Sequence, residues 1–328
     1  MALLEVKDLH TSFFTDAGEV KAVDGVSFQL DHGKVLGIVG ESGSGKSVTA
    51  YSIMQILAPT GKIVSGSVKL DGQELVGAVE KLLRTVRGNK VSIICQDPMT
   101  SLNPTYTVGR QRMEAILLHT GRNRRLAKER ALEMLRLVNV NEPEKRMKQY
   151  PYELSGGMRQ RVMIAMALAC EPDILIADEP TTALDVTIQA QVLDLINNLK
   201  HENNTSVIFI THDLGVIAEM SDDVAVMYLG KIVESCDVDT LFYNPQHPYT
   251  RALLKSIPTA DKQHKGRFES IRGTVPYAMN LPVQCGFCDR CDEAIKGVCD
   301  KGYPPNVEIE PGHFVRCFKF ADKGTEGK

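Results

Sequence analysis

The chain has 328 residues, of which 43% are hydrophobic and 24% charged. This composition is typical of soluble globular proteins and excludes collagen-like, disordered and low-complexity chains. At about 150 residues per domain, the length predicts two domains. The 38 basic and 41 acidic residues give a formal net charge of −3, without the basic excess that favours nucleic-acid binding.

No apolar run reaches the ~18 residues that a bilayer-spanning helix needs. The nearest run, Val162 to Ala169, is followed by Cys170, Glu171 and Pro172. The N-terminus carries Glu5 and Asp8 where a signal peptide would have a basic start and a longer apolar stretch. We therefore expect a cytoplasmic chain that does not cross a membrane.

The first 40 residues predict three strands. Residues Leu4–Leu9 and Val23–Leu30 alternate between apolar and polar, as in strands with one buried face. After a turn at Gly33, the run Val35–Val39 is apolar without alternation, which indicates a strand buried on both faces of a sheet.

A glycine-rich loop, a helix and another strand come next. The loop covers Gly40–Ser47, and the helix is predicted to continue to Leu57 and to stop before Pro59. Residues Ser67–Leu70 with the turn Asp71-Gly72 predict a strand in an antiparallel piece.

Helices and strands alternate through the middle of the chain. Helices are predicted over about 109–147, over Arg161–Ala169 and over about Thr187–Lys200, with strands at Ile174–Ala177 and Val207–Ile210. This alternation predicts a mostly parallel α/β sheet. Past Pro258 the pattern dissolves into Gly, Pro and Cys, which places a domain boundary between about 250 and 260.

The loop Gly40-Glu-Ser-Gly-Ser-Gly-Lys-Ser47 fits the phosphate-loop pattern G-x-x-x-x-G-K-S/T and lies between a buried strand and a helix. Its glycines let backbone N–H groups turn toward phosphate oxygens, and the following helix adds its positive N-terminal end. The lysine would reach the β and γ phosphates, and the final serine would bind Mg²⁺. The predicted phosphate contacts are Gly40, Ser42, Gly43, Ser44, Gly45, Lys46 and Ser47.

A phosphate loop alone leaves kinases, GTPases, helicases and transporters open. The strand at Ile174 ends in two carboxylates, Asp178 and Glu179. The first can hold Mg²⁺ and the second can polarise an attacking water, a role that a kinase would not need.

The segment Leu154-Ser-Gly-Gly-Met-Arg-Gln-Arg161 resembles the LSGGQ-type signature of ATP-binding cassette (ABC) ATPases. The resemblance implies that Ser155, Gly156 and Gly157 bind the γ-phosphate of a nucleotide held by another subunit. A serine and two glycines that open a helix also form an anion site on physical grounds. The implied fold is the P-loop ABC nucleotide-binding domain, with a mostly parallel core, an antiparallel β subdomain and a helical subdomain.

Further elements of the ABC family occur in the expected order. Gln96 after the predicted strand Val91–Cys95 matches the Q-loop glutamine, Asp185 matches the D-loop aspartate, and His212 matches the switch histidine. Phe13 matches the aromatic position that stacks on adenine, although Phe14 is adjacent.

The resemblance implies a role for each motif residue. Glu179 would be the general base, His212 would hold the γ-phosphate, and Lys46 with Mg²⁺ would offset charge in the transition state. One chain would supply half of each active site, so ATP closes a head-to-tail pair and hydrolysis reopens it. The implied Mg²⁺ ligands are Ser47, Gln96 and Asp178.

Residues 150–161 and 244–254, the latter containing His247-Pro-Tyr249, look like the ABC subfamily that powers dipeptide and oligopeptide importers. This chain resembles the first, dipeptide-type ATPase of such systems. The implied partners are a second ATPase subunit, a paralogue or another copy, two integral membrane permease subunits, and indirectly an extracytoplasmic peptide-binding protein. The protein would work at the cytoplasmic face of the membrane.

Two alternatives remain open from the residues. Relatives in the subfamily import nickel or glutathione, and an ATPase subunit does not itself touch the transported substrate. A soluble ABC ATPase acting on nucleic acid or ribosomes is the second alternative, but such proteins usually have tandem cassettes or a basic surface. If the chain is an ATPase of a peptide importer, residues 1–255 form the ATPase domain, with a helical subdomain over about 97–160. Residues 256–328 then form a small irregular Cys-rich extension.

Five of the eight cysteines crowd one segment, Cys285-Gly-Phe-Cys288-Asp-Arg-Cys291 with Cys299 and Cys317. In a reducing compartment such a cluster indicates a metal before a disulfide. The subfamily pattern C-x-F-x-x-R-C implies a structural [4Fe–4S] cluster on Cys285, Cys291, Cys299 and Cys317. Cys288 departs from that pattern and could replace one ligand, while Zn²⁺ on four thiolates and unligated thiols are the competing interpretations.

Overall fold

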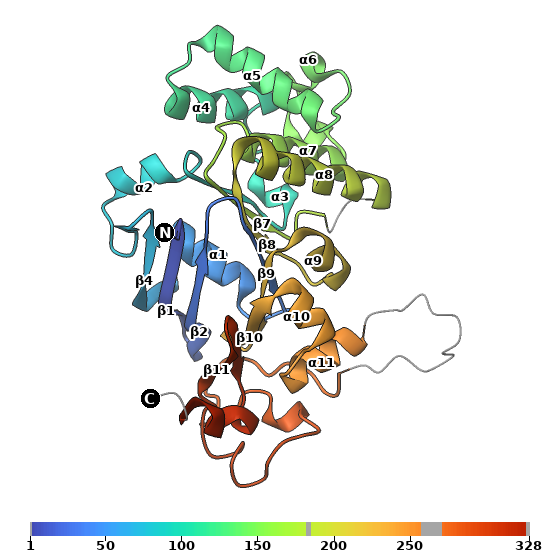
Figure 1. Ribbon diagram of the computed structural model, residues 1–328. Helices are drawn as coiled ribbons and strands as arrows, with labels where there is room; N and C mark the ends of the chain where they lie inside the picture. Colours follow the sequence, from blue (N-terminus) through green and yellow to red (C-terminus); the bar gives the residue numbers. More distant parts are fainter. Residues whose placement is uncertain (1, 182–184, 257–270, 326–328) are drawn as a thin grey trace, which may run out of the picture. The chain divides into compact units, whose positions relative to one another are not determined.

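The computed structural model describes residues 2–181, 185–256 and 271–325 (Figure 1). The chain forms two compact units. The first consists of Met1–Leu30, Leu36–Val76 and Thr211–Lys328, and the second of Asp31–Val35 and Gly77–Ile210. The predicted domain boundary near residue 255 stays a prediction.

An antiparallel sheet in the first unit has the strand order β2-β1-β4-β5. In β1, Leu4 pairs with Leu30 on one side and with Leu70 on the other, and all three are buried. This sheet confirms the predicted antiparallel piece, although its strands are longer than predicted. Their bounds are β1 (Leu4–Thr15), β2 (Gly18–Leu30), β4 (Gly61–Leu70) and β5 (Gln73–Glu74).

The first unit also contains strands in the order β11-β12-β10-β9-β3. The pair β3–β9 is parallel, and the other three pairs are antiparallel. The strands are β3 (Val35–Val39), β9 (Asp223–Tyr228), β10 (Lys231–Asp237), β11 (Asn306–Glu310) and β12 (His313–Arg316). The helices are α1 (Lys46–Met54), α9 (Leu214–Met220), α10 (Val238–Tyr243) and α11 (Pro248–Lys255), with 3-10 turns η2 (Cys288–Arg290) and η3 (Phe318–Thr325).

The second unit combines three parallel strands with helices. The strand order is β8-β7-β6, with β6 (Val91–Ile94), β7 (Ile174–Asp178) and β8 (Ser206–Ile210). Every residue of β7 and β8 is buried, as expected of strands that are apolar except for Asp178 at the end of β7 and Ser206 at the start of β8. The helices are α2 (Glu80–Val86), α3 (Pro98–Ser101), α4 (Val108–Thr120), α5 (Arg124–Leu137), α6 (Pro143–Arg146), α7 (Gly156–Ala167) and α8 (Val186–Asn203), with the 3-10 turn η1 (Pro151–Glu153).

The α/β fold with parallel and antiparallel strands agrees with the expected class. Helix α7 begins at Gly156 rather than at Arg161 because Ser155 caps it, and α1 ends at Met54 rather than at Leu57 because Gln55 adopts a left-handed φ of 54°. The extension predicted to be irregular contains the hairpin β11–β12, which pairs with β10.

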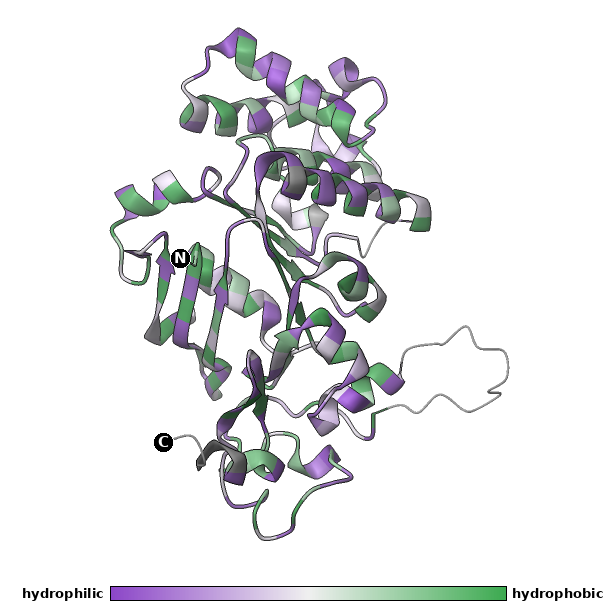
Figure 2. Cartoon of the chain, viewed as in Figure 1, coloured by the Kyte–Doolittle hydropathy of each residue, from purple (hydrophilic) through white to green (hydrophobic). Residues whose placement is uncertain are grey.

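The hydropathy of the chain matches this architecture. Figure 2 shows hydrophobic residues concentrated in strands such as β7 and β8, whereas α5 mixes hydrophilic and hydrophobic positions. Among the residues that the structure describes, no helix has both the length and the apolar character that crossing a membrane requires.

Candidate functional site

The predicted phosphate loop joins β3 to α1 in the first unit, and its backbone requires glycine. Gly40, Gly43 and Gly45 have φ values of 152°, 80° and 100°, which side-chain-bearing residues rarely adopt. A Cβ atom at Gly40 would lie 2.1 Å from the carbonyl oxygen of Met227, and one at Gly45 would lie 2.3 Å from that of Ala22. The loop therefore keeps the bare backbone that lets N–H groups face an anion at the start of α1.

Lys46 folds back over this loop. Its Nζ donates hydrogen bonds to the carbonyl oxygens of Gly40 at 2.8 Å and Glu41 at 3.1 Å, and the residue is 6% exposed. The ammonium group is thus held inside the loop by neutral carbonyl groups. A phosphate oxygen offers a charged acceptor and would compete well for the same protons.

The other predicted residues of the first unit lie on β1 and before α9. The backbone N–H of Thr211 donates to the carbonyl oxygen of Ile38 at 3.3 Å, so the His212 segment runs beside the strand that enters the phosphate loop. His212 itself is exposed. On β1, the Phe13 ring lies against Gly61 and is partly exposed, while Phe14 is 50% exposed.

In the second unit, the Q-loop glutamine meets the predicted general base. Asp178 is fully buried at the end of β7, and Glu179 comes next with a φ of 48°. The backbone N–H of Glu179 donates to the carbonyl oxygen of Ile210 at 2.8 Å, which fixes the residue beside the end of β8. Gln96 Nε2 donates to Glu179 Oε2 at 3.0 Å, so these two predicted residues are in direct contact.

The signature serine and the D-loop aspartate both cap helices in the second unit. Ser155 accepts from the backbone N–H of Met158 at 3.4 Å at the start of α7, and Asp185 accepts from that of Ile188 at 3.0 Å at the start of α8. Both line one hollow of about 430 Å³, together with Arg146. Two helix N-termini, Arg146 and Arg161 favour an anion there, against the single carboxylate of Asp185. Thr182, Ala183 and Leu184 of the D-loop lie outside the described residues.

Two buried contacts around α7 were not predicted. Gln160 donates from its carboxamide to the carbonyl oxygen of Pro180, which comes directly after Glu179, and so ties the signature helix to the end of β7. Arg112 is fully buried and donates to the carbonyl oxygens of Val162 and Ala165, both at 3.3 Å. Arg112 follows Gln111 and Gln160 lies between two arginines, so no signal in the sequence marks either residue as buried or identifies its partner.

The clustered thiols lie in the first unit and are all reduced. The backbone N–H of Cys285 donates to the carbonyl oxygen of Cys299 at 2.8 Å, and that of Cys288 to Cys285 at 2.9 Å. Burial, together with the nearby Cys299, Cys317 and Cys288, raises the pKa of Cys285 to about 11. Burial also raises the pKa of Cys291 and Cys317, and each of these thiols is also affected by Cys299.

The cysteine thiols are suitable ligands for an iron–sulfur cluster, but their side chains are not grouped as the ligands of a metal site are. Thiols are the ligands that iron–sulfur clusters and structural zinc take. Within 2–181, 185–256 and 271–325, however, no three or more His, Cys, Asp or Glu side chains stand together as metal ligands do. The predicted [4Fe–4S] cluster and the Zn²⁺ alternative are therefore not confirmed.

Two family models match the chain. The model of the ABC transporter family matches residues 23–182, which include the phosphate loop, the signature and the two carboxylates after β7. The model described as oligopeptide/dipeptide transporter, C-terminal region, matches residues 233–299. That second match includes His247-Pro-Tyr249 and four of the clustered cysteines.

Curated relatives match over nearly the whole chain. A probable peptide ABC transporter ATP-binding protein of Sinorhizobium fredii is 53% identical over 318 residues, which are 97% of this chain and 95% of the relative. The oligopeptide transport ATP-binding protein AppD of Bacillus subtilis is 49% identical over 325 residues, 99% of this chain and 98% of the relative. A solved dimeric ATP-binding cassette in a post-hydrolysis state, bound to ADP and phosphate, matches with a TM-score of 0.66 at 26% identity, covering 72% of this chain and 98% of that one.

Proposed function

This chain belongs to the ATP-binding proteins of oligopeptide and dipeptide ABC transporters, and we propose that it builds its ATP sites jointly with a second ATP-binding subunit beneath two membrane permease subunits. The chain is an ATPase whose activity drives peptide import. Hydrolysis depends on motif residues of this chain and on the partner subunit that completes each site.

The observation that supports the hydrolytic part of the proposal is the contact between Gln96 and Glu179, in which the carboxamide donates to the carboxylate at 3.0 Å. We propose that this carboxylate, directly after β7, takes a proton from water. The water oxygen attacks the γ-phosphorus, the bond to the bridging oxygen of ADP breaks, and the water proton passes to Glu179. Phosphate and ADP are the products.

The phosphate loop supplies the binding half of this chemistry. Lys46, now held by the carbonyls of Gly40 and Glu41, exchanges them for the β and γ phosphates. We propose that Ser47, Asp178 and Gln96 would hold Mg²⁺, which would neutralise phosphate charge when bound. His212 contacts the γ-phosphate, and Phe13 stacks on adenine. The loop residues that contact phosphate are Gly40, Ser42, Gly43, Ser44 and Gly45.

The signature hollow supports a shared site. Ser155 and Asp185 place two helix N-termini at a space suited to an anion. We propose that Ser155, Gly156 and Gly157 receive the γ-phosphate of ATP held by the second ATP-binding subunit, which is a paralogue or another copy of this chain. Hydrolysis removes that phosphate, and the two ATP-binding subunits then separate at the cytoplasmic face of the membrane. Their separation moves the permease.

The cysteine-rich segment has a separate assignment. We propose that Cys285, Cys291, Cys299 and Cys317 hold a [4Fe–4S] cluster with a structural role. The support is the thiol donor set, the raised pKa values of Cys285, Cys291 and Cys317, to which Cys299 contributes, and the family pattern in the sequence. Cys288 is the fifth thiol and is assigned no iron.

Transport by the assembled system tests the proposal. The chain is reconstituted in vesicles with its candidate second ATPase, the permease subunits and the peptide-binding protein, and uptake of a labelled dipeptide is followed with ATP on the cytoplasmic side. Peptide should stimulate ATP hydrolysis several-fold, as expected when closure depends on the loaded permease. Nickel or glutathione as the only transported substrate, with no response to peptide, would reject the peptide assignment.

A further inference from the structure

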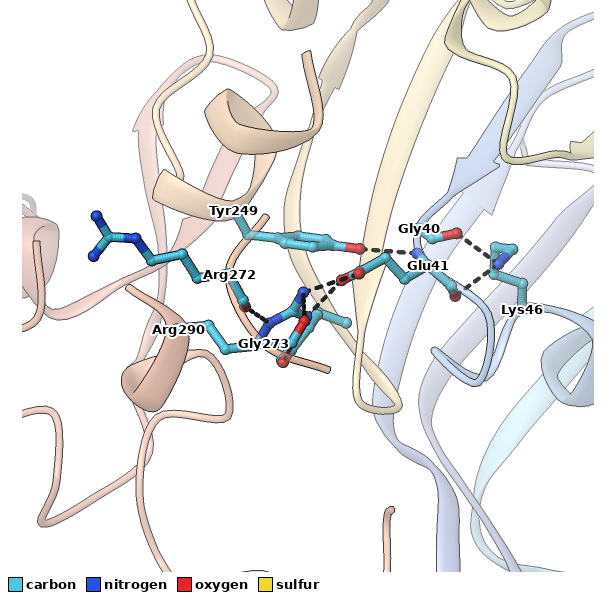
Figure 3. A network of polar contacts seen from close by, with 8 residues as sticks. Gly40, Glu41, Lys46, Tyr249, Arg272, Gly273 and Arg290 are labelled. Atoms are coloured by element: carbon cyan, nitrogen blue, oxygen red, sulfur yellow. Dashed lines mark hydrogen bonds and ion pairs between the residues drawn. The ribbon is translucent and has the colours of Figure 1, made fainter. Parts of the chain in front are cut away.

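The second residue of the phosphate loop, Glu41, is held from two sides by the C-terminal region (Figure 3). Arg290 forms a two-pronged ion pair with its carboxylate, with Nη1–Oε2 at 2.6 Å and Nη2–Oε1 at 3.0 Å. The hydroxyl oxygen of Tyr249 accepts a hydrogen bond from the backbone N–H of Glu41 at 2.8 Å. We call Arg290, Tyr249 and Glu41 the loop clamp.

The two holding side chains are themselves fixed. Tyr249 is fully buried, and its ring lies 4.7 Å from that of Tyr228 and 5.3 Å from that of Phe287. Arg290 is 9% exposed, and its Nε donates to the carbonyl oxygen of Arg272 at 2.7 Å. A buried, paired and bidentate arginine gives a rigid contact.

The loop clamp contacts Lys46 through Glu41. Glu41 offers its carboxylate to Arg290, its N–H to Tyr249 and its carbonyl oxygen to Lys46. All three contacts converge on the start of the loop, where the left-handed Gly40 precedes Glu41. Neither Arg290 nor Tyr249 belongs to the phosphate-loop motif, since they lie 249 and 208 residues further along the chain.

We propose that Arg290 and Tyr249 are positioning residues for ATP binding: they hold the phosphate loop in its binding shape, and Arg290 neutralises a carboxylate that would otherwise repel the triphosphate. The inference rests on the proposed function of this loop in binding ATP. It gives the C-terminal region a direct role at the nucleotide site.

Two physical effects support this role. A loop that is ordered before binding loses less conformational entropy when ATP arrives, which tightens binding without any new contact to the ligand. Glu41 is 27% exposed at its side chain, so its charge without Arg290 would be only partly screened by solvent. Loss of Arg290 should therefore cost more than loss of the Glu41 charge.

The test measures the Kd of a fluorescent ATP analogue and the KM and kcat for ATP of the full chain. Arg290→Gln should raise the Kd about tenfold, because it leaves a carboxylate unpaired beside the loop. Glu41→Gln should raise it only about twofold to threefold, and the double variant should return close to the Glu41→Gln value. Tyr249→Phe should raise it about threefold, with KM affected more than kcat.

Arg272→Gln is the matched control. Its side chain is 81% exposed and pairs with Asp292, and Figure 3 draws it directed away from Glu41, while the carbonyl group that Arg290 uses is kept. This variant should bind nucleotide like the unmodified chain. The Arg290→Gln effect should also shrink by about half or more when the salt concentration rises about tenfold, since screening weakens repulsion between charges.

The outcomes separate the two claims. An unmodified chain that binds no nucleotide would reject the proposed function, and the clamp with it. If the unmodified chain binds ATP, Arg290→Gln and Tyr249→Phe variants that fold and bind it equally well would overturn the clamp. A double variant as weak as Arg290→Gln would overturn the electrostatic part.

Discussion

The phosphate loop at 40–47 is shaped by its own backbone, whereas the thiols at 285–317 share a segment without forming a metal-type group among the described residues. In the loop, left-handed glycines and the contacts of Lys46 define the backbone geometry. In the cysteine-rich segment, hydrogen bonds fix the backbone at Cys285 and Cys299, but the sulfur atoms are not arranged as a ligand set.

The difference lies in which atoms do the binding. Backbone N–H groups are placed as soon as the chain takes its φ and ψ angles, so a backbone site is complete when the fold is complete. Thiol side chains retain rotamer freedom, and burial favours their neutral form until a cation is bound. Three sets of measurements test this difference, with the strongest effect first.

Glu179→Gln should lower the rate of ATP hydrolysis by a hundredfold or more, since a positioned general base contributes roughly 10²–10⁴-fold. The loop residues are untouched, so the Kd for ATP should stay within about twofold. Single-turnover hydrolysis and nucleotide binding measure the two quantities. Glu129→Gln on α5, which removes an exposed charge paired with Arg125, is the control. Unchanged turnover in Glu179→Gln would remove its assigned role.

Cys299→Ser should abolish most of the bound iron and the absorbance near about 400 nm in anaerobically purified protein, whereas Cys288→Ser should keep both. The reason is that the family pattern implies Cys299 as a ligand, whereas Cys288 departs from that pattern. Metal analysis and absorbance spectra measure this. A colourless protein with bound zinc would show that the site holds zinc instead of iron. Equal losses of bound iron in both variants would reject the proposed ligand set.

The smallest effect concerns His247, which caps α11, the helix that carries Tyr249 of the loop clamp. Its Nδ1 accepts the backbone N–H of Tyr249 at 3.1 Å, and burial, followed by the charge of Arg251, lowers its pKa from 6.5 to about 3. Between these values the unfolded chain binds a proton that the folded chain does not. The contribution of neutral His247 to the free energy of unfolding is therefore complete above pH 6.5 and is lost as the pH falls toward 3. The free energy of unfolding falls by ~1.4 kcal/mol per pH unit at most.

Urea unfolding at several pH values compares the chain with His247→Asn, which keeps a capping acceptor but does not titrate. The variant should show a shallower loss of unfolding free energy below pH 6.5. Parallel curves for the two proteins would mean that His247 is not the group responsible.

The sequence predicted the strand–loop–helix setting of the phosphate loop because that pattern is local. Gly40, Lys46 and Ser47 lie within one strand–loop–helix unit, and the apolar run at Ile174 leads directly to Glu179. The loop clamp could not be predicted in the same way. Tyr249 and Arg290 are visible as motif residues, but only the folded chain shows that both reach Glu41.

The hairpin β11–β12 was also hidden in the sequence. On β11 only Val307 and Ile309 alternate, and Val307 alone is buried. Two positions are too few to outweigh the surrounding Gly, Pro and Cys residues. The turn at Pro311-Gly312, where Gly312 has a φ of 78°, was the available signal.

This hairpin has a consequence for how the protein behaves among its neighbours. By pairing with β10, it leaves the five-residue β11 as the outermost strand on that side, with Glu308 and Glu310 exposed. A short, negatively charged border is a poor template for the strands of other molecules. The tail therefore discourages aggregation of the sheet that leads into the nucleotide loop.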